Sequence, residues 1–568
     1  MQIDLRGVPG EIPPLTELPL LSRIYAARGV RHAEELERGL KHLLPWQSLK
    51  GIDAALALLQ QALRERWSIL VVGDYDADGA TASSVAVLGL RALGAAQVDY
   101  LVPSRFDYGY GLTPEIVAVA AERRPQLLVT VDNGISSIDG VAAAKAQGMR
   151  VLVTDHHLPG AQLPEADAIV NPNQPGCAFP SKAMAGVGVM FYVLLGLRAQ
   201  LREQGWFAGR SEPNLAELLD LVALGSVADV VPLDANNRIL VHQGLLRIRA
   251  GHCRPGIRAL LEIAGRNLAS VGSTDLGFIL GPRLNAAGRL DDMSYGIECL
   301  LCDDPQLARE MALELDEKNQ ERKSIEQGMQ REALAQLRAL DEQSLPFGLC
   351  LYEPDWHQGV IGILASRLKE RYHRPTIAFA AAADGTLKGS ARSIQGLHVR
   401  DALEAVAALH PGLIIKFGGH AMAAGLTLHE GDFDRFSQAF DAQVRRQLTA
   451  EDLTGRVLSD GELTHADVCL PVAHALRQAG PWGQGFPEPL FHGVFRLLDQ
   501  RLLKDKHLKL QLQSECGRVQ VDGIAFNVER EQWPNPTRQW ARLVYKLEVN
   551  EYRGRESVQL LITHLEAC

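Results

Sequence analysis

The sequence predicts a multidomain α/β protein: a parallel-sheet core, a long helix leading to a smaller α/β domain, and a C-terminal β-barrel or sandwich. The chain has 568 residues, and at about 150 residues per domain this length corresponds to three or four domains. Between about residues 65 and 235, short apolar runs alternate with Ala-rich stretches, and after about residue 455 several strand-like runs follow one another. With 46% hydrophobic and 22% charged residues, the composition is globular and excludes a largely disordered or fibrous chain.

The first region is expected to form a parallel sheet. Short β-branched and apolar runs at 68–72, 127–131 and 151–154 each stop at a polar cluster, and the Ala-rich stretches 79–93 and 136–147 have helical character. Short buried-type strands separated by helices indicate βαβ units. In such sheets, ligands bind at the carboxyl ends of the strands.

One long helix is expected between residues 303 and 345. Its apolar residues recur at helical spacing among dense mixed charge, and no proline follows Pro305. Proline suits the first turn of a helix, with Asp303 or Asp304 as the cap. The simplest interpretation is a helix that connects two lobes. An interruption near Gly328 and heptad pairing with a partner are the alternatives.

A second α/β region is expected from about 346 to 447, where glycines cluster in three places. After it, strand-like runs occur at 491–498, 508–512, 519–526, 540–549 and 557–563. Several short strands at such spacing predict a small β-barrel or sandwich.

The composition also limits the functional classes. The 58 Lys and Arg residues against 68 Asp and Glu residues give a net charge of −10, which by itself argues against a nucleic-acid partner. We expect no secretory signal, because no basic segment followed by an apolar one opens the sequence, and the apolar run 187–197 is shorter than the roughly 18 residues of a membrane span. Eight scattered cysteines fit free thiols in a reducing cytosol, so we expect a cytoplasmic protein.

Acidic residues and histidines follow the three predicted strands, with a further aspartate after a hydrophobic stretch. Taken singly, these motifs could be a helix-capping turn, an ordinary Asp-Asn-Gly turn and a surface histidine pair. Together they would place like charges on one edge of the sheet, where they repel strongly unless a cation neutralises them. Oxygen ligands suit hard divalent cations, and the loop does not match an EF-hand. The sequence therefore predicts a two-metal site formed by Asp74, Asp76, Asp78, Asp132, Asp155, His156, His157 and Asp229.

Two further segments could bind a nucleic-acid end. Arg105 and Tyr110 lie beside flexible glycines; arginine can bind a terminal phosphate bidentately and a tyrosine ring can stack on a base. A tyrosine-rich surface loop is the alternative. Gly419 and His420 offer backbone N–H groups and an imidazole, which suit an anion.

Four of these motifs, in this order, resemble those of the DHH phosphoesterases: 74-DxDxDG-79, 132-DNG-134, 155-DHH-157 and 225-GxxAD-229. Downstream motifs are similar to the DHHA1-containing members: 281-GPRLNAAGR-289, 356-WHxGVIG-362, 389-GSxRS-393 and 418-GGH-420. Over nearly the whole chain, the pattern resembles the bacterial single-strand-specific 5′→3′ DNA exonucleases of this superfamily. The resemblance implies an N-terminal segment (1–45), a DHH catalytic domain (46–265), a connecting region with the long helix (266–345), a DHHA1 domain (346–450) and an OB-like barrel (451–568).

The resemblance also implies residue roles. The metal ligands would be Asp76, Asp78, Asp132, His156 and Asp229, with Asp74 as a further ligand or a group behind the ligands. Asp155 would orient a histidine, and His157 would stabilise charge or donate a proton at the scissile phosphate. The substrate-binding residues would be Arg105, Tyr110, Arg283, Asn285, Arg289, Ser390, Arg392, Gly419 and His420, of which Ser390 and Arg392 resemble a 5′-phosphate pocket. Buried ion pairs for Arg283 and Arg289, and an ordinary turn at Ser390–Arg392, are the alternatives.

The implied activity is hydrolysis of single-stranded DNA to 5′-mononucleotides with two Mn²⁺ or Mg²⁺ ions, in DNA repair and recombination, including mismatch repair. A RecQ-type helicase and single-stranded-DNA-binding protein are the expected partners, and we expect a monomer with no membrane partner. One alternative is a DHH phosphodiesterase for oligoribonucleotides or cyclic dinucleotides, which is usually shorter. Another is a catalytically inactive scaffold, which has no need to keep so many like charges together.

Overall fold

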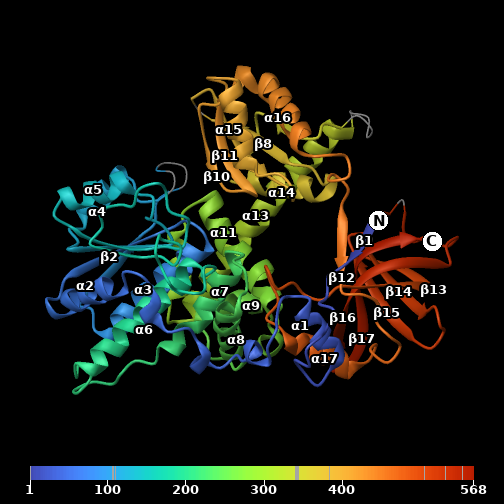
Figure 1. Cartoon of the computed structure of the whole chain (residues 1–568), viewed down its shortest axis with the longest axis horizontal. Coiled ribbons are helices and arrows are strands. Elements are labelled where there is room, and N and C mark those ends of the chain that lie inside the picture. The colour runs from blue at the N-terminus through green and yellow to red at the C-terminus, as the bar shows by residue number, and fades with distance from the viewer. Residues whose placement is uncertain are drawn as a thin grey trace. The chain divides into compact units, whose positions relative to one another are not determined.

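Figure 1 shows the computed structural model of the chain, which describes residues 2–104, 108, 111–338, 345–382, 384–504, 506–530, 532–552 and 554–568. The chain divides into two compact units. One unit comprises residues 317–457 with the N-terminal residues up to Asp4, and the other combines residues 5–316 with 458–568. Within the described ranges, no helix is both long enough and apolar enough to cross a membrane.

The larger unit contains a sheet with the strand order β3-β2-β4-β5-β6, in which each pair of neighbours is parallel. Side chains of β2 alternate between two apolar cores: Ile69 and Val71 contribute to one, and Leu70 and Val72 to the other. This burial on both faces confirms the predicted parallel sheet. Its strands are β2 (Ser68–Gly73), β3 (Gln97–Leu101), β4 (Leu127–Val131), β5 (Arg150–Thr154) and β6 (Ala168–Val170).

Helices cover both faces of this sheet (Figure 1). Helices α4 (Pro114–Glu122) and α5 (Ile138–Ala146) lie on one face, and α2 (Ile52–Arg64), α3 (Ala77–Leu93) and α6 (Gly186–Glu203) lie on the other. Both faces of the sheet are therefore covered by helices, and its carboxyl edge carries the polar residues that follow β2, β4 and β5.

The remaining helices of this unit extend the core beyond the sheet. Three of its segments, α10, a π-helical turn at Leu276–Leu280 and α11, follow one another without a break in the chain. The helices are α1 (Pro19–Ala26), α7 (Leu219–Ala228), α8 (Ala235–Arg249), α9 (Pro255–Ile263), α10 (Ser273–Asp275), α11 (Gly281–Leu290) and α12 (Ser294–Leu301).

The predicted long helix is α13 (Pro305–Arg338). Asp304 caps it, because its Oδ1 accepts hydrogen bonds from the backbone N–H groups of Gln306 and Leu307 at 2.7 and 3.2 Å. The alternative of an interruption near Gly328 is wrong, since the helix continues through that residue. A glycine inside a helix lowers the helix stability by only about 1 kcal/mol relative to alanine. The other residues of a long helix offset this loss.

The smaller unit contains a second sheet with the order β10-β11-β9-β8-β7, in which β7 and β8 are parallel and the other pairs antiparallel. Phe379, Phe436 and Phe440 fill its core. Its strands are β7 (Leu349–Tyr352), β8 (Thr376–Ala381), β9 (Thr386–Arg392), β10 (Lys416–Gly419) and β11 (Ala423–His429). Its helices are α14 (Ile361–Tyr372), α15 (Val399–Leu409) and α16 (Phe433–Gln447), and β1 (Gln2–Leu5) pairs with β12 (Arg456–Ser459).

The C-terminal strands form a closed barrel with the order β13-β14-β15-β17-β16. Only the contact between β15 and β17 is parallel. A closed five-stranded barrel agrees with the OB-like domain expected from the resemblance, since OB folds are small five-stranded barrels. After α17 (Leu470–Ala479) come β13 (Phe491–Leu503), β14 (His507–Ser514), β15 (Gln520–Phe526), β16 (Trp540–Tyr552) and β17 (Arg555–Ala567).

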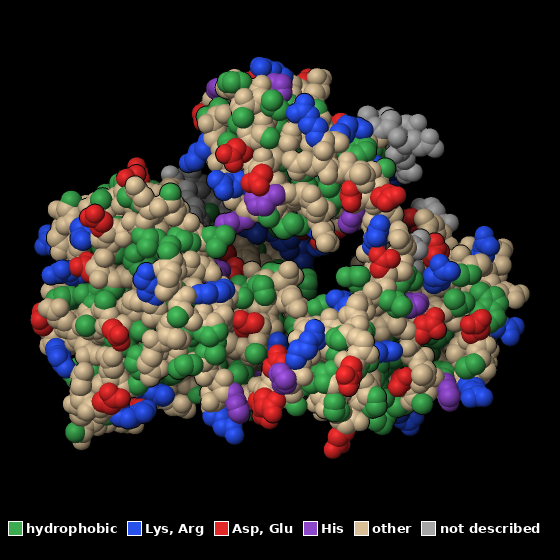
Figure 2. All heavy atoms as spheres, in the orientation of Figure 1, with side chains coloured by type: hydrophobic (Ala, Val, Ile, Leu, Met, Phe, Trp, Pro, Cys, Tyr) green, Lys and Arg blue, Asp and Glu red, His purple; other side chains and the backbone are tan. Residues whose placement is uncertain are grey.

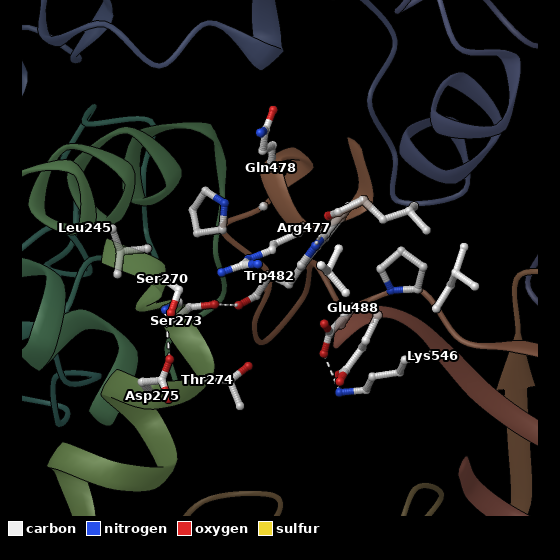
Figure 3. A pocket seen from close by; sticks show the side chains of 18 of the residues that line it. Leu245, Ser270, Ser273, Thr274, Asp275, Arg477, Gln478, Trp482, Glu488 and Lys546 are labelled. Atoms are coloured by element: carbon white, nitrogen blue, oxygen red, sulfur yellow. Dashed lines mark hydrogen bonds and ion pairs between the residues drawn. The ribbon is translucent and has the colours of Figure 1, made fainter. Parts of the chain in front are cut away.

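The segment between α17 and the barrel packs against the helices of the same unit. The rings of Trp482 and Phe486 stack on each other at 5.2 Å and on Tyr25 at 6.0 Å. Ser273 Oγ donates a hydrogen bond to the carbonyl oxygen of Trp482 at 2.6 Å, beside a cavity of about 420 Å³ (Figure 3). Trp482 and Phe486 therefore join the barrel to its neighbour and are buried from solvent.

Candidate metal centre

The loop after β2 turns tightly into α3 and carries three aspartates. Asp76 is the N-cap of α3, and its Oδ1 accepts from the backbone N–H groups of Asp78 and Gly79 at 2.9 and 3.0 Å. A Cβ at Gly79 would lie 2.3 Å from the carbonyl oxygen of Asp74, so only glycine permits this turn. The helix-capping interpretation therefore holds for Asp76, and it does not remove the carboxylate from the acidic cluster.

Asp78 is 1% exposed and is held by the first turn of α6. Its Oδ2 and Oδ1 accept from the backbone N–H groups of Gly186 and Val187 at 2.6 and 2.9 Å. Helix N-termini stabilise carboxylates in this way. Burial, followed by the charge of Asp76, nevertheless raises the pKa of Asp78 to about 7.

Asp132 follows β4 in a left-handed conformation, with φ of 61°. His156, which follows β5, contacts three carboxylates: its Nε2 lies 3.0 Å from Asp132 Oδ1, 3.6 Å from Asp229 Oδ2 and 3.9 Å from Asp78 Oδ2. Asp229 comes directly after α7. Three different segments thus bring their acidic groups to one histidine.

Asp155 and His157 form a separate pair at the same edge of the sheet. His157 Nδ1 lies 2.7 Å from Asp155 Oδ1, and Asp155 Oδ2 accepts from the backbone N–H of Ile135 at 2.9 Å. Burial opposes the charge of both groups. The hydrogen bond between them nonetheless lowers the pKa of Asp155 and raises the pKa of His157. The pair therefore favours an ionised carboxylate beside a protonated imidazole.

The donor atoms converge closely enough to hold metal ions. In each of three groups, the ligand atoms lie within 4.8 Å of one another: Asp132 with His156 and His157, Asp78 with His156 and Asp229, and Asp74 with Asp76 and Asp132. Burial first, and then repulsion by neighbouring aspartates, raise the pKa of Asp132 and of Asp229 well above the usual range. Carboxylate oxygens with imidazole nitrogen suit divalent cations. The residues therefore fit a metal centre, because a cation would relieve the repulsion.

Several residues that position the two histidines and Asp78 were not predicted from the sequence. Asn171 Nδ2 donates to the carbonyl oxygen of His157 at 2.9 Å, and Asn173 Nδ2 donates to that of His156 at 2.6 Å. Both follow β6, the fifth strand of the sheet along the chain, so an asparagine pair after this strand was the available signal. Gly186 and Val187 gave no such signal, because they bind Asp78 through their backbone N–H groups.

Helix α11 supports the acidic loop. The Oδ1 of Asn285 accepts from the backbone N–H of Ala77 at 2.8 Å, and a Cβ at Gly288 would lie 2.1 Å from the carbonyl oxygen of Tyr75. Arg283 is buried and forms an ion pair with Asp316 at 2.7 Å, as the ion-pair interpretation expected. Arg289 is half-buried on the same helix. The predicted residues Arg105 and Tyr110 lie outside the described residues.

The predicted anion-binding residues of the smaller unit occupy one end of its sheet. Arg392 donates from Nη1 to Ser390 Oγ at 3.1 Å, and Arg392 lies opposite Ala423 of β11. Gly419, with φ of 144°, and His420 form the exposed turn between β10 and β11. These four predicted residues therefore share a sheet end.

The first turn of α14 closes over two of them. A Cβ at Gly362 would lie 2.8 Å from Arg392 Nη2 and 2.9 Å from Ser390 Oγ, so the helix approaches this pair as closely as a glycine allows. The arrangement combines a guanidinium, a hydroxyl and a helix start, which suits a phosphate.

Comparisons with known proteins agree with this architecture. Family models match residues 68–226 (DHH family, N-terminal domain), 346–446 (DHHA1 domain) and 459–564 (RecJ OB domain). The single-stranded-DNA-specific exonuclease RecJ of Salmonella typhimurium is 60% identical over 98% of this chain and 96% of its own, and that of Escherichia coli is 59% identical over 99% and 97%. The crystal structure of Thermus thermophilus RecJ in complex with Mn²⁺ matches with a TM-score of 0.80 and 32% identity, covering 97% of this chain and 76% of that one. The corresponding Mg²⁺ complex matches with a TM-score of 0.74 and 30% identity, covering 97% and 75%. With three matching domains and full-length relatives of this identity, the chain belongs to the RecJ family of single-stranded-DNA-specific exonucleases.

Proposed function

We propose that this member of the family digests single-stranded DNA in the 5′→3′ direction and releases 5′-mononucleotides, using two divalent cations, Mn²⁺ or Mg²⁺. The observation that carries the proposal is the convergence of buried carboxylates and a histidine at the carboxyl edge of the parallel sheet. The relatives crystallised with Mn²⁺ and Mg²⁺ support the choice of ions. The ligands would be Asp74, Asp76, Asp78, Asp132, His156 and Asp229.

The contacts of the residues around the metal centre indicate what each would do in the reaction. Bound cations would supply a water of lowered pKa and would offset the charge of the scissile phosphate. Asp155 holds the His157 ring through Nδ1 and favours its protonated form, so His157 is suited to donate a proton or stabilise charge at the phosphate. Asn171 and Asn173 fix the backbone of the two histidines.

The 5′ end would be bound in the smaller unit. Ser390 and Arg392 offer a hydroxyl and a guanidinium beside the start of α14, and the exposed turn at Gly419 and His420 adds an imidazole at the same end of the sheet. Terminal phosphates are bound by such donor sets.

Other residues would follow the strand beyond its 5′ end. Arg105 and Tyr110 would contact the backbone and a base near that end. On α11, Arg283, Asn285 and Arg289 would border the substrate path. Since Asn285 bonds the acidic loop and Arg283 is paired with Asp316, these two would act by holding the loop and helix in place.

The cellular role rests on the family. We infer that the chain acts on cytoplasmic DNA in repair and recombination, including mismatch repair, with a RecQ-type helicase supplying single strands and single-stranded-DNA-binding protein coating them. A closed OB-type barrel in the chain supports contact with single strands.

The direct test uses DNA labelled at one end. Single-stranded DNA labelled at the 5′ end should lose its label as mononucleotide at once in Mn²⁺, whereas a 3′ label should persist in shortening fragments. EDTA should stop both reactions. The same strand as RNA and a blunt duplex should remain largely intact. Early release of the 3′ label would overturn the direction, and cleavage in EDTA would overturn the metal dependence.

One variant links the activity to the metal centre. Asp132→Ala should abolish hydrolysis, because Asp132 belongs to two of the three ligand groups, and should leave DNA binding intact. The fold should persist, since Asp132 is one of several carboxylates that repel one another. Asp139→Ala, an exposed aspartate on neighbouring α5, is the control and should keep full activity. Retained cleavage by Asp132→Ala would remove Asp132 from the metal site.

A further inference from the structure

Two exposed apolar side chains accompany the metal-centre residue Asp229. Phe278 is 77% exposed and Val230, the residue after Asp229, is 61% exposed. Single exposed apolar residues are common and need no explanation. These two stand out because both lie on unusual backbone, next to a group that the reaction uses.

The backbone at both residues is irregular. Val230 has φ of 63°, a conformation that is a genuine outlier for a β-branched residue. Phe278 lies in the π-helical turn Leu276–Leu280, whose end residues are fully buried while Phe278 points outward. Strained residues cluster at functional sites, and π-helical turns occur there frequently.

Contacts bring the two residues to the same place. A Cβ at Gly277 would lie 3.2 Å from Val227 Cγ1, and a Cβ at Gly281 would lie 3.2 Å from Ala228 Cβ. The glycines on either side of Phe278 therefore pack on the last residues of α7, directly before Asp229. The π-turn continues into α11, which bonds the acidic loop through Asn285.

We propose that Phe278 is a base-stacking residue for the single-stranded substrate, with Val230 as its apolar neighbour beside Asp229. The inference rests on the proposed function, because it needs a nucleobase next to the metal centre. Bases next to the bond that is cut must lie near Asp229, and an aromatic face accepts any base without reading its sequence. This suits an exonuclease that must accept every nucleotide in turn.

The test compares Phe278→Ala with wild type on single-stranded DNA in Mn²⁺. Loss of one stacking contact should raise KM about tenfold with little change in kcat, and Phe278→Tyr should restore the wild-type KM. Leu246→Ala, another exposed apolar residue of the same unit, should leave both constants unchanged. Since Phe278 is exposed, its replacement should not lower Tm.

Abasic nucleotides identify the contact. An oligonucleotide with abasic sites near its 5′ end should lower the kcat/KM of the wild type by the same factor, and Phe278→Ala should show no further loss on it. As a readout without catalysis, 2-aminopurine at these positions should be quenched on binding to wild type in EDTA and not on binding to Phe278→Ala. Unchanged kinetics, or a fall in Tm alone, would overturn the stacking role. Absence of any cleavage by wild type would instead overturn the proposed function.

Discussion

At the scale of single residues, backbone N–H groups hold the carboxylates of the metal centre against their mutual repulsion. Asp78 accepts two such bonds from the start of α6, and Asp76 accepts two from the start of α3. At Asp78 these bonds favour the ionised carboxylate, whereas burial and the charge of Asp76 favour the protonated one and raise its pKa to about 7. The backbone bonds therefore fix both carboxylates in position, and Asp78 is ready to exchange a proton for a cation.

Asp155 orients His157 through a hydrogen bond to its Nδ1, and replacing Asp155 by asparagine tests that role. Asp155→Asn keeps the size of the side chain but replaces a carboxylate oxygen by an amide NH₂, so the side chain can no longer accept hydrogen bonds from both the protonated His157 Nδ1 and the N–H of Ile135. Loss of such a supporting partner should lower kcat about 10- to 100-fold. Steady-state kinetics on single-stranded DNA in Mn²⁺ measure the change.

The matched control is Asp167→Asn. Asp167 pairs with Arg150 and accepts from the N–H of Val151 at the other end of β5, so it has similar bonds far from the metal centre. Its replacement should leave kcat unchanged. Equal kcat values for the two variants would show that Asp155 does not support catalysis.

At the scale of elements, the first turn of α6 packs directly against the acidic cluster. A Cβ at Gly186 would lie 2.5 Å from Asp132 Cβ and 2.8 Å from its Oδ1, so Gly186→Ala must displace either the helix or the ligand. We expect this variant to lose most Mn²⁺-dependent activity. Activity at rising Mn²⁺ concentration measures how far the loss reflects weaker metal binding.

Gly188→Ala is its control on the same helix. The nearest atom to a Cβ at Gly188 is Met184 Cβ at 3.7 Å, an ordinary contact. This variant should keep its activity, and its Tm should stay equal or rise slightly because alanine favours helix. An active Gly186→Ala variant would mean that the cluster tolerates displacement of Asp132.

The elements also show why the sequence predicts one half of the site and misses the other. Apart from Asp229, which follows α7, the aspartates and histidines follow strands, and parallel strands place such residues on one edge whatever their separation in the chain. The groups that hold them obey no such rule: Gly186 lies 108 residues from Asp78, and Asn285, which was predicted to bind substrate and not to hold this loop, lies 208 residues from Ala77. A backbone N–H carries no side-chain signal, so only the fold reveals that contact.

At the scale of the whole molecule, the net charge of −10 does not describe the surface that meets DNA. Figure 2 shows acidic and basic side chains interspersed over the visible face of both units. Several of the aspartates that make the total negative are buried in the metal centre, where two divalent cations would offset about four negative charges. In the metal-free chain, the raised pKa values of Asp78, Asp132 and Asp229 let protons neutralise part of this charge in place of the cations.

This competition between protons and cations predicts how pH controls the effect of metal on stability. The pKa of Asp78 rises on folding from 3.8 to about 7, first through burial and then through Asp76. In metal-free protein, its contribution to stability is fully present below the unfolded pKa and is lost as pH rises through about 7. Cations compete with the same proton, so they bind more tightly above that pH.

Mn²⁺ should therefore raise Tm more at pH 8 than at pH 6, relative to EDTA at the same pH. Thermal unfolding with and without Mn²⁺ measures both differences. Asp132→Ala should show a smaller gain at pH 8, because it lacks one ligand and relieves repulsion on the others, whereas Asp139→Ala should match wild type. An equal gain at both pH values would mean that the cluster is already ionised before the metal binds. The buried N–H bonds to Asp78 would then outweigh its burial.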